Sequence, residues 1–378
     1  MKMYTKKMAD LRDRAKKVAG ALRSKAQRAD ELDELHPALL EALWESGFMT
    51  MSVPRDNGGH GLSTVEASVV VEELARGSGA AALMVLLQSM ACSVISDYAS
   101  DKHKDELLAK VVDERGIMAF ALSEPGPEEG GSVTRAKKIK SGYSVQGRKT
   151  FVSGAREADI ILVFAVTSPK SGLKKALSCF AVPAGTTGMI PGKELSKSGL
   201  RGVPAVDIVF EGCKVPASYR LGKQGEGYSI AGKALVAACP LAASLSMGLL
   251  AEALDQSLSS AKTRGEESFS LSESQPLEMA LAEMAGALDS GRAFVWAAAR
   301  AVDEGMEEAE RMGREVKCMA TESAVTEIDK AMRMFGLSGT LRGSALERLS
   351  RDARAAQIVL GPNHIHRIEV ARKLLACK

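Results

Sequence analysis

Residues 120–126 read FALSEPG and residues 142–159 read GYSVQGRKTFVSGAREAD, and these two stretches lie in the part of the chain that decides the fold. They belong to a series of short β-branched or aromatic runs between residues 117 and 226 that are separated by Gly, Pro, Ser and Lys turns. The other runs are DIILVFAV, LSCFAVPA and VDIVFEGCKVP. Several strands at short spacing, with no helical pattern between them, predict a compact antiparallel β-domain.

Helical periodicity flanks this β-domain on both sides. Before it, apolar residues recur at helical spacing from Leu11 to Leu22, and Ser-Thr-Val-Glu at 63–66 supplies a capping box ahead of an apolar run. After it come long amphipathic segments, among them SLSMGLLAEALDQSLSSAKTR and PLEMALAEMAGALDSGRAFVWAAARAVDEG. The sequence therefore predicts an α+β chain in three domains: a helical N-terminal domain (1–116), the β-domain (117–226) and a C-terminal helical bundle (227–378).

Composition disfavours several classes of partner. Fifty Lys and Arg against 47 Asp and Glu leave a formal charge of +3, and 4% aromatic residues do not suit a nucleic-acid surface. No run approaches ~18 uninterrupted apolar residues, so no membrane span is expected, and the N-terminus lacks the apolar core of a secretory signal. The six cysteines are scattered without a CxxC pair, which predicts buried thiols in a reducing, cytoplasmic compartment. His364 and His366 predict helix-face polarity rather than a metal site.

The two opening stretches resemble the acyl-CoA dehydrogenase family, in which T-E-P-G on the first strand of the β-domain precedes a G-x-K-x-[WF]-I-[TS]-N-G strand. The likeness covers essentially the whole chain, because VPRDNGGHGLS, KSGLRG, VFEGCKVP, LGKQGEGY, MGLLAEALDQ and RDARAAQI follow in family order. It implies the family fold with a four-helix C-terminal bundle and FAD as the cofactor. It also implies an acyl thioester as substrate, with CoA expected in preference to a carrier protein as the thiol. It also implies an electron-transfer flavoprotein as redox partner, and a homotetramer or a heterotetramer with a sister chain.

The resemblance implies one set of residues around the isoalloxazine ring of FAD. Phe120, Leu122 and Ser123 would line its pyrimidine edge through backbone N–H groups and the Ser hydroxyl. Phe151 would pack on the ring, and the hydroxyl of Ser153 would approach N5. Preorganised donors suit this site, because reduced flavin carries negative charge around N1.

A second set would contact the pyrophosphate and adenosine end of FAD, which the family holds partly with a neighbouring subunit. Arg264 stands in the place of the family's R-x-x-F-G motif, and Gln275 follows at the family interval. AMRMFGLSGT stands where the family has A-V-Q-x-x-G-G-x-G, so Gly336 and Gly339 remain while Arg333 replaces the Gln. Whether Arg333 contacts phosphate or is a surface charge stays open.

The positions of the catalytic base depart from the family. There, a carboxylate removes the α-proton of the thioester while the β-hydrogen leaves as hydride to flavin N5. The Glu of the family's E-G-[TS] turn aligns with Leu360 in VLGPNHIHR, and the base position of a smaller branch aligns with Ala238. Gly361 of the turn is kept, and Arg367 matches the family Arg that supports the CoA end of the substrate.

Three interpretations of the missing carboxylate stay open. The chain is a redox enzyme whose non-standard base comes from elsewhere, with Glu128, Glu129 and Asp97 as candidates. Alternatively, it performs family-fold chemistry that needs no such base, such as enoyl reduction or elimination of a β-substituent. In the third interpretation it is a non-catalytic or FAD-sharing subunit of a hetero-oligomer, and a sister chain supplies the Glu.

Overall fold

The N-terminal part of the chain is helical, as predicted. A computed structural model describes residues 5–126, 133–169, 172–264 and 275–376. The helices are α1 (Lys6–Leu32), α2 (Pro37–Glu45), α3 (Thr64–Gly77), α4 (Gly79–Tyr98) and α5 (Asp101–Val112), with 3-10 turns at Phe48–Thr50 and Arg55–Asn57. The predicted capping box begins α3: the Ser63 hydroxyl accepts from the Glu66 N–H, and the Glu66 carboxylate accepts from the Ser63 N–H.

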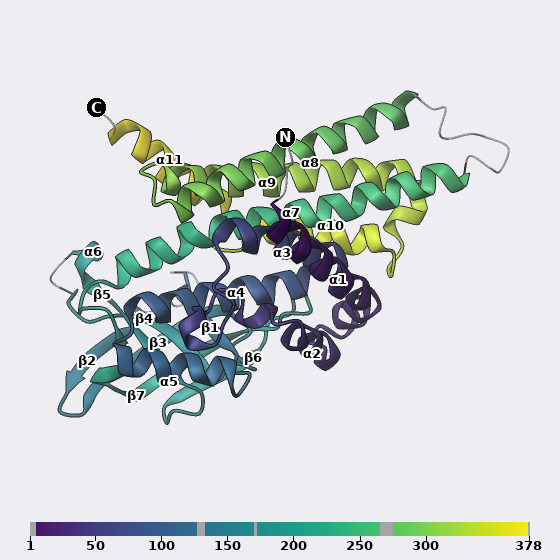
Figure 1. Ribbon diagram of the computed structural model, residues 1–378. Coiled ribbons are helices and arrows are strands. Elements are labelled where there is room, and N and C mark those ends of the chain that lie inside the picture. The colour runs from purple at the N-terminus through teal and green to yellow at the C-terminus, as the bar shows by residue number, and fades with distance from the viewer. Residues whose placement is uncertain (1–4, 127–132, 170–171, 265–274, 377–378) are drawn as a thin grey trace.

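The middle of the chain forms an eight-stranded sheet, at the lower left of Figure 1. Its strands are β1 (Met118–Ala121), β2 (Arg135–Ile139), β3 (Gly142–Ser153), β4 (Ile160–Val166), β5 (Leu177–Pro183), β6 (Met189–Glu194), β7 (Ala205–Pro216) and β8 (Arg220–Leu221), and the short helix α6 (Leu173–Ala176) precedes β5. The order is β6-β7-β3-β2-β4-β5-β8, with β1 beside β4.

The sheet departs from the predicted antiparallel pattern around β4. Most neighbouring strands are antiparallel, but β1 runs parallel to β4, and β2 meets β4 in parallel at a single pair of residues. The chain returns to β4 only after the β2–β3 hairpin, and a strand that returns through such a crossover runs parallel to its partner. Period-two alternation shows that a strand is present but not which strand lies beside it.

The C-terminal part is a helical bundle around one long helix. Its members are α7 (Gly227–Arg264), α8 (Gln275–Asp303), α9 (Ala309–Phe335), α10 (Ala345–Ala356) and α11 (Asn363–Ala376), with a 3-10 turn at Gly336–Thr340. α7 packs against α3, α4, α8, α9 and α10, so it is the core helix that joins the bundle to the N-terminal domain.

Two helices are long and apolar enough to cross a membrane by length and composition alone, Gly79–Tyr98 and residues 227–262 of α7. In each, 83% of the apolar window is buried inside the molecule. Their apolar surface is therefore covered by other helices and by the sheet, as in the core helices of a folded domain.

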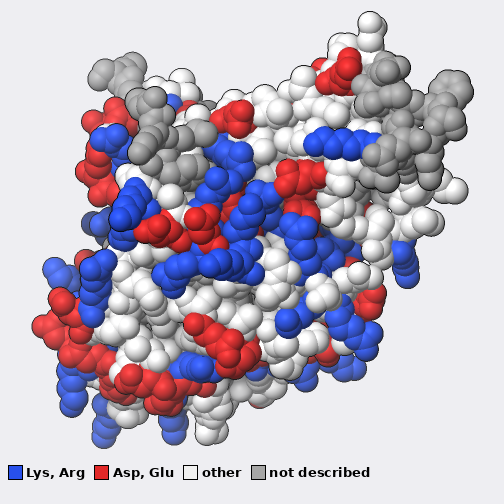
Figure 2. Space-filling model, turned by 45° about the vertical axis from the view of Figure 1, so that its right-hand side comes forward, with Lys and Arg blue, Asp and Glu red and all other residues white. Residues whose placement is uncertain are grey.

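Charged side chains of both signs are interspersed on the face shown in Figure 2. Some of the ion pairs connect the domains: Arg292 of α8 contacts Glu72 of α3 at 2.6 Å, and Arg23 of α1 contacts Glu252 of α7 at 2.7 Å. Glu72 and Glu252 are both buried. Removing one partner of such a pair leaves a buried charge uncompensated, so these pairs fix how the N-terminal domain sits on the bundle.

Candidate active site

The five residues expected around the flavin ring come together on two strands that contact each other. They are Phe120, Leu122 and Ser123, in and just after β1, and Phe151 and Ser153, at the end of β3. The N–H of Thr150 donates to the carbonyl of Ser123 at 3.0 Å, which joins the two segments. The Phe120 ring packs on the Phe164 ring with 4.8 Å between centroids, so its side chain is part of the packing of the sheet.

The backbone around Phe151 presents its ring to solvent. Its φ is +56°, in the left-handed region that costs a non-glycine residue roughly 1–2 kcal/mol, and the residue is 56% exposed. The register of β3 against β7 shifts here, and Asp207 of β7 accepts from the Phe151 N–H at 3.1 Å and the Thr150 hydroxyl at 2.7 Å. Burial opposes ionisation of Asp207, but hydrogen bonds from Thr150 and Arg148 outweigh it and lower its pKa.

A buried lysine fastens the FALSEPG segment to β3. Lys149 is 1% exposed, and its Nζ donates to the carbonyl of Leu122 at 3.0 Å and to the carboxylate of Glu124 at 2.9 Å. The same Glu124 oxygen accepts from the N–H of Thr134 at 2.8 Å. Burial lowers the pKa of Lys149, and the Glu124 carboxylate opposes that shift. The sequence analysis contained Lys149 only as the Lys of the G-x-K-x-[WF] strand and gave it no role, and it missed Asp207, whose signal was a single charge inside the apolar run VDIVF.

These strands fit the isoalloxazine ring of a flavin. Phe151 offers an exposed flat ring for stacking. Ser123 is exposed and Ser153 half-buried, and within the described ranges neither hydroxyl has a protein partner, so both are available to a ligand. The residues that would hold the ring are therefore positioned by Asp207 and Lys149 before any ligand binds.

The turn that carries Leu360 is held by another buried lysine. Leu360 has φ +60° and Gly361 φ +102°. Lys317 of α9 donates to the carbonyls of Gln357 and Gly361 and to the side-chain oxygen of Asn363, each at 2.7 Å. Burial lowers the pKa of Lys317 to about 8, so at neutral pH it is an ammonium whose three N–H groups match the three acceptors.

His366 supports the same turn and is not the helix-face residue that the sequence predicted. It is 2% exposed, whereas His364 is exposed. Its Nε2 lies 3.0 Å from the carbonyl oxygen of Leu360, which can only accept, so Nε2 carries the proton and Nδ1 accepts from Arg314 at 3.3 Å. Burial, together with the Lys317 and Arg314 cations, lowers the pKa of His366 to about 4. The imidazole is therefore neutral at pH 7.

The second base position lies on a buried face of α7. Ala238 lines a cavity of about 80 Å³ between α7 and the N-terminal domain, and no carboxylate is among the described residues that line this cavity. Of the candidate replacement bases, Asp97 is exposed in the last turn of α4 and does not line the cavity. Glu128 and Glu129 lie outside the described residues.

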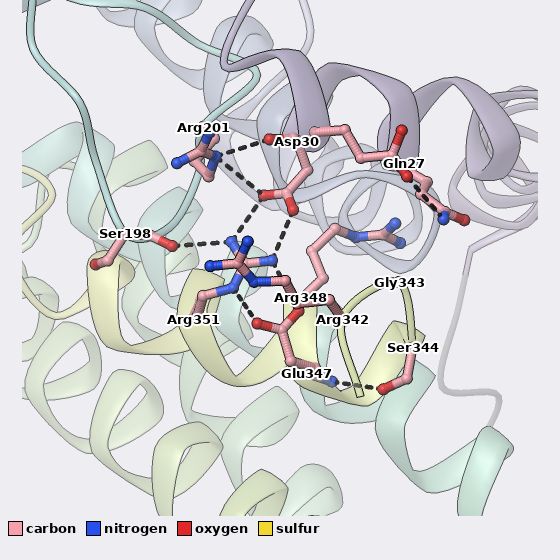
Figure 3. A pocket seen from close by; sticks show the side chains of 11 residues that line it. Gln27, Asp30, Ser198, Arg201, Arg342, Gly343, Ser344, Glu347, Arg348 and Arg351 are labelled. Atoms are coloured by element: carbon pink, nitrogen blue, oxygen red, sulfur yellow. Dashed lines mark hydrogen bonds and ion pairs between the residues drawn. The ribbon is translucent and has the colours of Figure 1, made fainter. Parts of the chain in front are cut away.

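The Arg351-Asp352 pair of RDARAAQI joins three parts of the chain, and Figure 3 shows the contacts of Arg351. Arg351 of α10 binds both carboxylate oxygens of Asp30 on α1, at 2.8 and 2.6 Å, and the carbonyl of Ser198 at 2.9 Å. Asp352 is buried and accepts from the N–H of Leu200 at 2.6 Å; burial raises its pKa to about 6. A cavity of about 500 Å³ opens beside this ion-pair network. The motif thus fixes α10, and with it the start of the Leu360 turn.

The residues expected at the far end of FAD lie elsewhere, at the opposite end of the bundle from β1 and β3 (Figure 1). Gln275 begins α8 and is exposed, Arg333 is exposed in the last turn of α9, Gly336 caps α9 with φ +61°, and Gly339 is buried in the next turn. The side chain of Arg264 lies outside the described residues.

Arg367, expected at the CoA end of the substrate, is exposed on α11 and pairs with Glu322 of α9 at 2.6 Å. Gly361, the other residue expected to contact substrate, contributes its carbonyl to Lys317, as described above. A substrate contact by Arg367 would therefore be made by a guanidinium that Glu322 already orients.

Known proteins share this arrangement over nearly the full chain. Profiles of the acyl-CoA dehydrogenase N-terminal, middle and C-terminal domains match residues 5–115, 119–213 and 225–375. A cyclohex-1-ene-1-carbonyl-CoA dehydrogenase of Syntrophus aciditrophicus (strain SB) is 30% identical over 362 residues, 94% of this chain and 87% of its own. An acryloyl-CoA reductase (NADH) of Anaerotignum propionicum is 31% identical over 354 residues, 92% and 89% of the two chains. The FAD complex of PigA has a TM-score of 0.90 at 25% identity and covers 98% of each chain.

The fold is that of a flavoprotein oxidoreductase: a helical domain, a central sheet that presents an aromatic ring, and a helical bundle. The chain belongs to the acyl-CoA dehydrogenase family. The predicted fold class is confirmed, FAD is the cofactor, and an acyl thioester is the class of substrate.

Proposed function

We propose that this flavoenzyme reduces the α,β-double bond of an enoyl thioester. The observation that carries the proposal is an apolar side chain at both base positions, Leu360 and Ala238. Hydrogen bonds from Lys317 and His366 hold the Leu360 turn. Leu360, whose side chain cannot take a proton, therefore stands in a turn whose backbone is held in place by hydrogen bonds.

The direction of the reaction follows from the proton-transfer group that oxidation and reduction of the thioester each require. Oxidation of a saturated thioester starts with removal of a weakly acidic α-proton, which needs a strong and well-positioned base. Reduction needs the reverse: addition of hydride to the β-carbon leaves an enolate, which takes a proton from water. Reduced FAD, when bound, supplies that hydride. A site without a carboxylate at residue 360 or 238 therefore suits reduction better than dehydrogenation.

The electron balance requires a reductant. Each turnover adds a hydride and a proton to the substrate and leaves the flavin oxidised, so two electrons must return to it. We propose an electron-transfer flavoprotein, the partner that the family resemblance implies, as the source. The similarity to an acryloyl-CoA reductase supports the reductive direction.

The test uses the FAD-loaded protein under anaerobic conditions. Stoichiometrically reduced flavin is mixed with crotonyl-CoA, oxidised flavin is mixed with butyryl-CoA, and visible absorbance reports the flavin state. We expect crotonyl-CoA to restore the oxidised spectrum and to gain one solvent deuterium at its α-carbon in D₂O, while butyryl-CoA leaves the flavin unbleached. Bleaching by butyryl-CoA at a comparable rate would show that a base elsewhere supports dehydrogenation and would overturn the proposed direction.

A second candidate is the non-catalytic or FAD-sharing subunit. It is favoured by the same two apolar positions and by the distance between the two groups of expected FAD contacts, which a partner chain would bridge. Protein that remains colourless after incubation with FAD, but binds FAD on mixing with a sister chain, would support this candidate over the enzyme.

We also propose an oligomer, a homotetramer or a heterotetramer, in the cytoplasm. Apolar residues are exposed beside the distal FAD contacts, in the Leu360 turn and on the last helix, including Leu337 at 82%, Leu341, Ile358 and Leu375. Burying them against another subunit would bring a second set of FAD contacts to each flavin. The described cysteines are buried free thiols, which supports a reducing compartment.

A further inference from the structure

The cavity beside the Arg351 ion pairs lies where the three domains meet (Figure 3). Its volume is about 500 Å³, and small-molecule sites commonly enclose roughly 300–1,000 Å³. Its walls come from α1, from Ser198 and Arg201 in the loop between β6 and β7, and from the start of α10. All eleven described residues that line it are polar or glycine. Such a lining suits a ligand without an apolar part.

The carboxylates in the lining are already engaged by cations. Arg351 donates to Asp30 and to Glu347, each at 2.6 Å. Glu31 pairs with Arg28 of α1 at 3.5 Å, and Arg28 does not line the cavity. The negative charge of the lining is therefore compensated by side chains of the protein itself.

Two arginines of the lining lack such a partner. The guanidinium groups of Arg342, which is exposed, and Arg348, which is half-buried, have no ion pair or hydrogen bond to a described residue. Arg201, by contrast, pairs with Asp33 at 3.5 Å. Ser344, the N-cap of α10, also lines the cavity, so the positive end of the helix dipole adds to the charge of the two arginines. The cavity is therefore suited to an anion.

The turn that contains Arg342 is ordered by contacts on both sides. Gly343 has φ +87°, and a Cβ at this position would be 3.3 Å from Nε2 of Gln27, so the turn lies directly against α1. The Ser344 hydroxyl accepts from the Glu347 N–H at 3.2 Å and fixes the start of α10. The two guanidinium groups therefore project from an ordered turn and an ordered helix.

This cavity is separate from the sites described above. Of the described residues that line it, none belongs to the sets expected around FAD or the acyl thioester. Its walls include α1 of the N-terminal domain and the loop before β7, to which neither set extends. A ligand bound here would contact all three domains at once.

We propose that the cavity binds a small, wholly polar phosphorylated metabolite, such as a phosphorylated polyol or hydroxy acid, whose phosphate is held by Arg342 and Arg348. Guanidinium groups match phosphate oxygens with pairs of parallel N–H···O bonds, and two of them balance the charge of a phosphate dianion. The hydroxyls of the ligand would face the polar lining. This inference does not depend on the proposed direction of the flavin reaction.

The experiment is calorimetric titration of the FAD-loaded protein with glycerol 3-phosphate at fixed ionic strength. FAD already fills its own phosphate contacts in this protein, so it leaves the cavity as the site under test. We expect one glycerol 3-phosphate to bind per chain, inorganic phosphate to compete with it, and glycerol not to bind. Arg342→Gln and Arg348→Gln should each weaken binding about tenfold to hundredfold, the loss expected for a hydrogen bond to a charged group.

Arg135→Gln is the matched control, because Arg135 is an exposed arginine on β2, outside the described lining of the cavity. It should bind glycerol 3-phosphate as tightly as the wild type. Because Arg342 is exposed, its variant tests the proposal even if Arg348→Gln does not fold. No binding of glycerol 3-phosphate at about 10 mM, or an affinity that Arg342→Gln leaves unchanged, would overturn the proposal while the proposed flavin reaction stands. Binding of inorganic phosphate alone would overturn the organic ligand.

Discussion

Replacing His366 by Gln should change how the stability of the protein depends on pH. The folded-state pKa of His366 is about 4, against an ordinary value of 6.5. Between these values the unfolded chain binds more protons, so the His366 contribution to the free energy of unfolding is complete above pH 6.5 and is lost as pH falls toward 4. The physical reason is that protonation would bury a third cation beside Arg314 and Lys317.

The magnitude follows from the size of the shift. A pKa lowered from 6.5 to about 4 contributes roughly 3 kcal/mol to the free energy of unfolding at neutral pH. About 2 to 3 kcal/mol of this contribution would be lost by pH 4.5. Asp352 acts in the opposite direction: its pKa is raised to about 6, so its contribution is complete below its unfolded pKa and is lost as pH rises through 6. The pH dependence of the wild type alone therefore cannot isolate His366.

The assay is urea unfolding followed by circular dichroism, at fixed protein concentration, from pH 4.5 to 7.5. The quantity of interest is the difference between wild type and His366→Gln at each pH, in which the Asp352 contribution cancels. We expect the free energy of unfolding of the wild type, minus that of His366→Gln, to be about 2 to 3 kcal/mol larger at pH 7.5 than at pH 4.5. His364→Gln replaces an exposed neighbour, and its free energy of unfolding plotted against pH should run parallel to that of the wild type. Parallel curves for His366→Gln as well would refute the assignment of a buried, neutral imidazole.

Three further outcomes are expected. Leu360→Glu places a carboxylate at the family base position, so bleaching of the flavin by butyryl-CoA should rise roughly 10²–10⁴-fold; an unchanged rate in flavin-loaded variant would mean that residue 360 does not face the α-carbon. Phe151→Gly relieves the positive φ and removes the exposed ring, so the apo-protein should gain about 1 kcal/mol in stability while FAD affinity falls several-fold in equilibrium titration; tighter FAD binding would contradict the stacking role. Lys317→Met leaves three acceptors in the Leu360 turn without their donor and should cost at least about 3 kcal/mol in urea unfolding, whereas Lys233→Met at an exposed position of α7 should cost little.

The flavin site shows how far the sequence could carry the prediction. Family order placed Phe120, Ser123, Phe151 and Ser153 together, and the structure brings them together in and just after β1 and at the end of β3. The sequence did not predict that Phe151 has a positive φ, because that conformation is imposed by Asp207, 56 residues away. A local pattern cannot encode a strain that a distant side chain maintains.

The sequence by itself determined which parts of the chain are helical and which part forms the sheet, and it located the start of α3, because periodicity and capping act over a few neighbouring residues. It also determined that Leu360 and Ala238 cannot act as bases. Only the tertiary structure decided that β1 lies parallel to β4, that Lys317 and His366 hold the Leu360 turn, and that the Ser89 hydroxyl is buried without a partner among the described residues. Each of these depends on burial and on contacts between residues far apart in the chain, and burial is what gives a lone charge or hydroxyl its energetic weight.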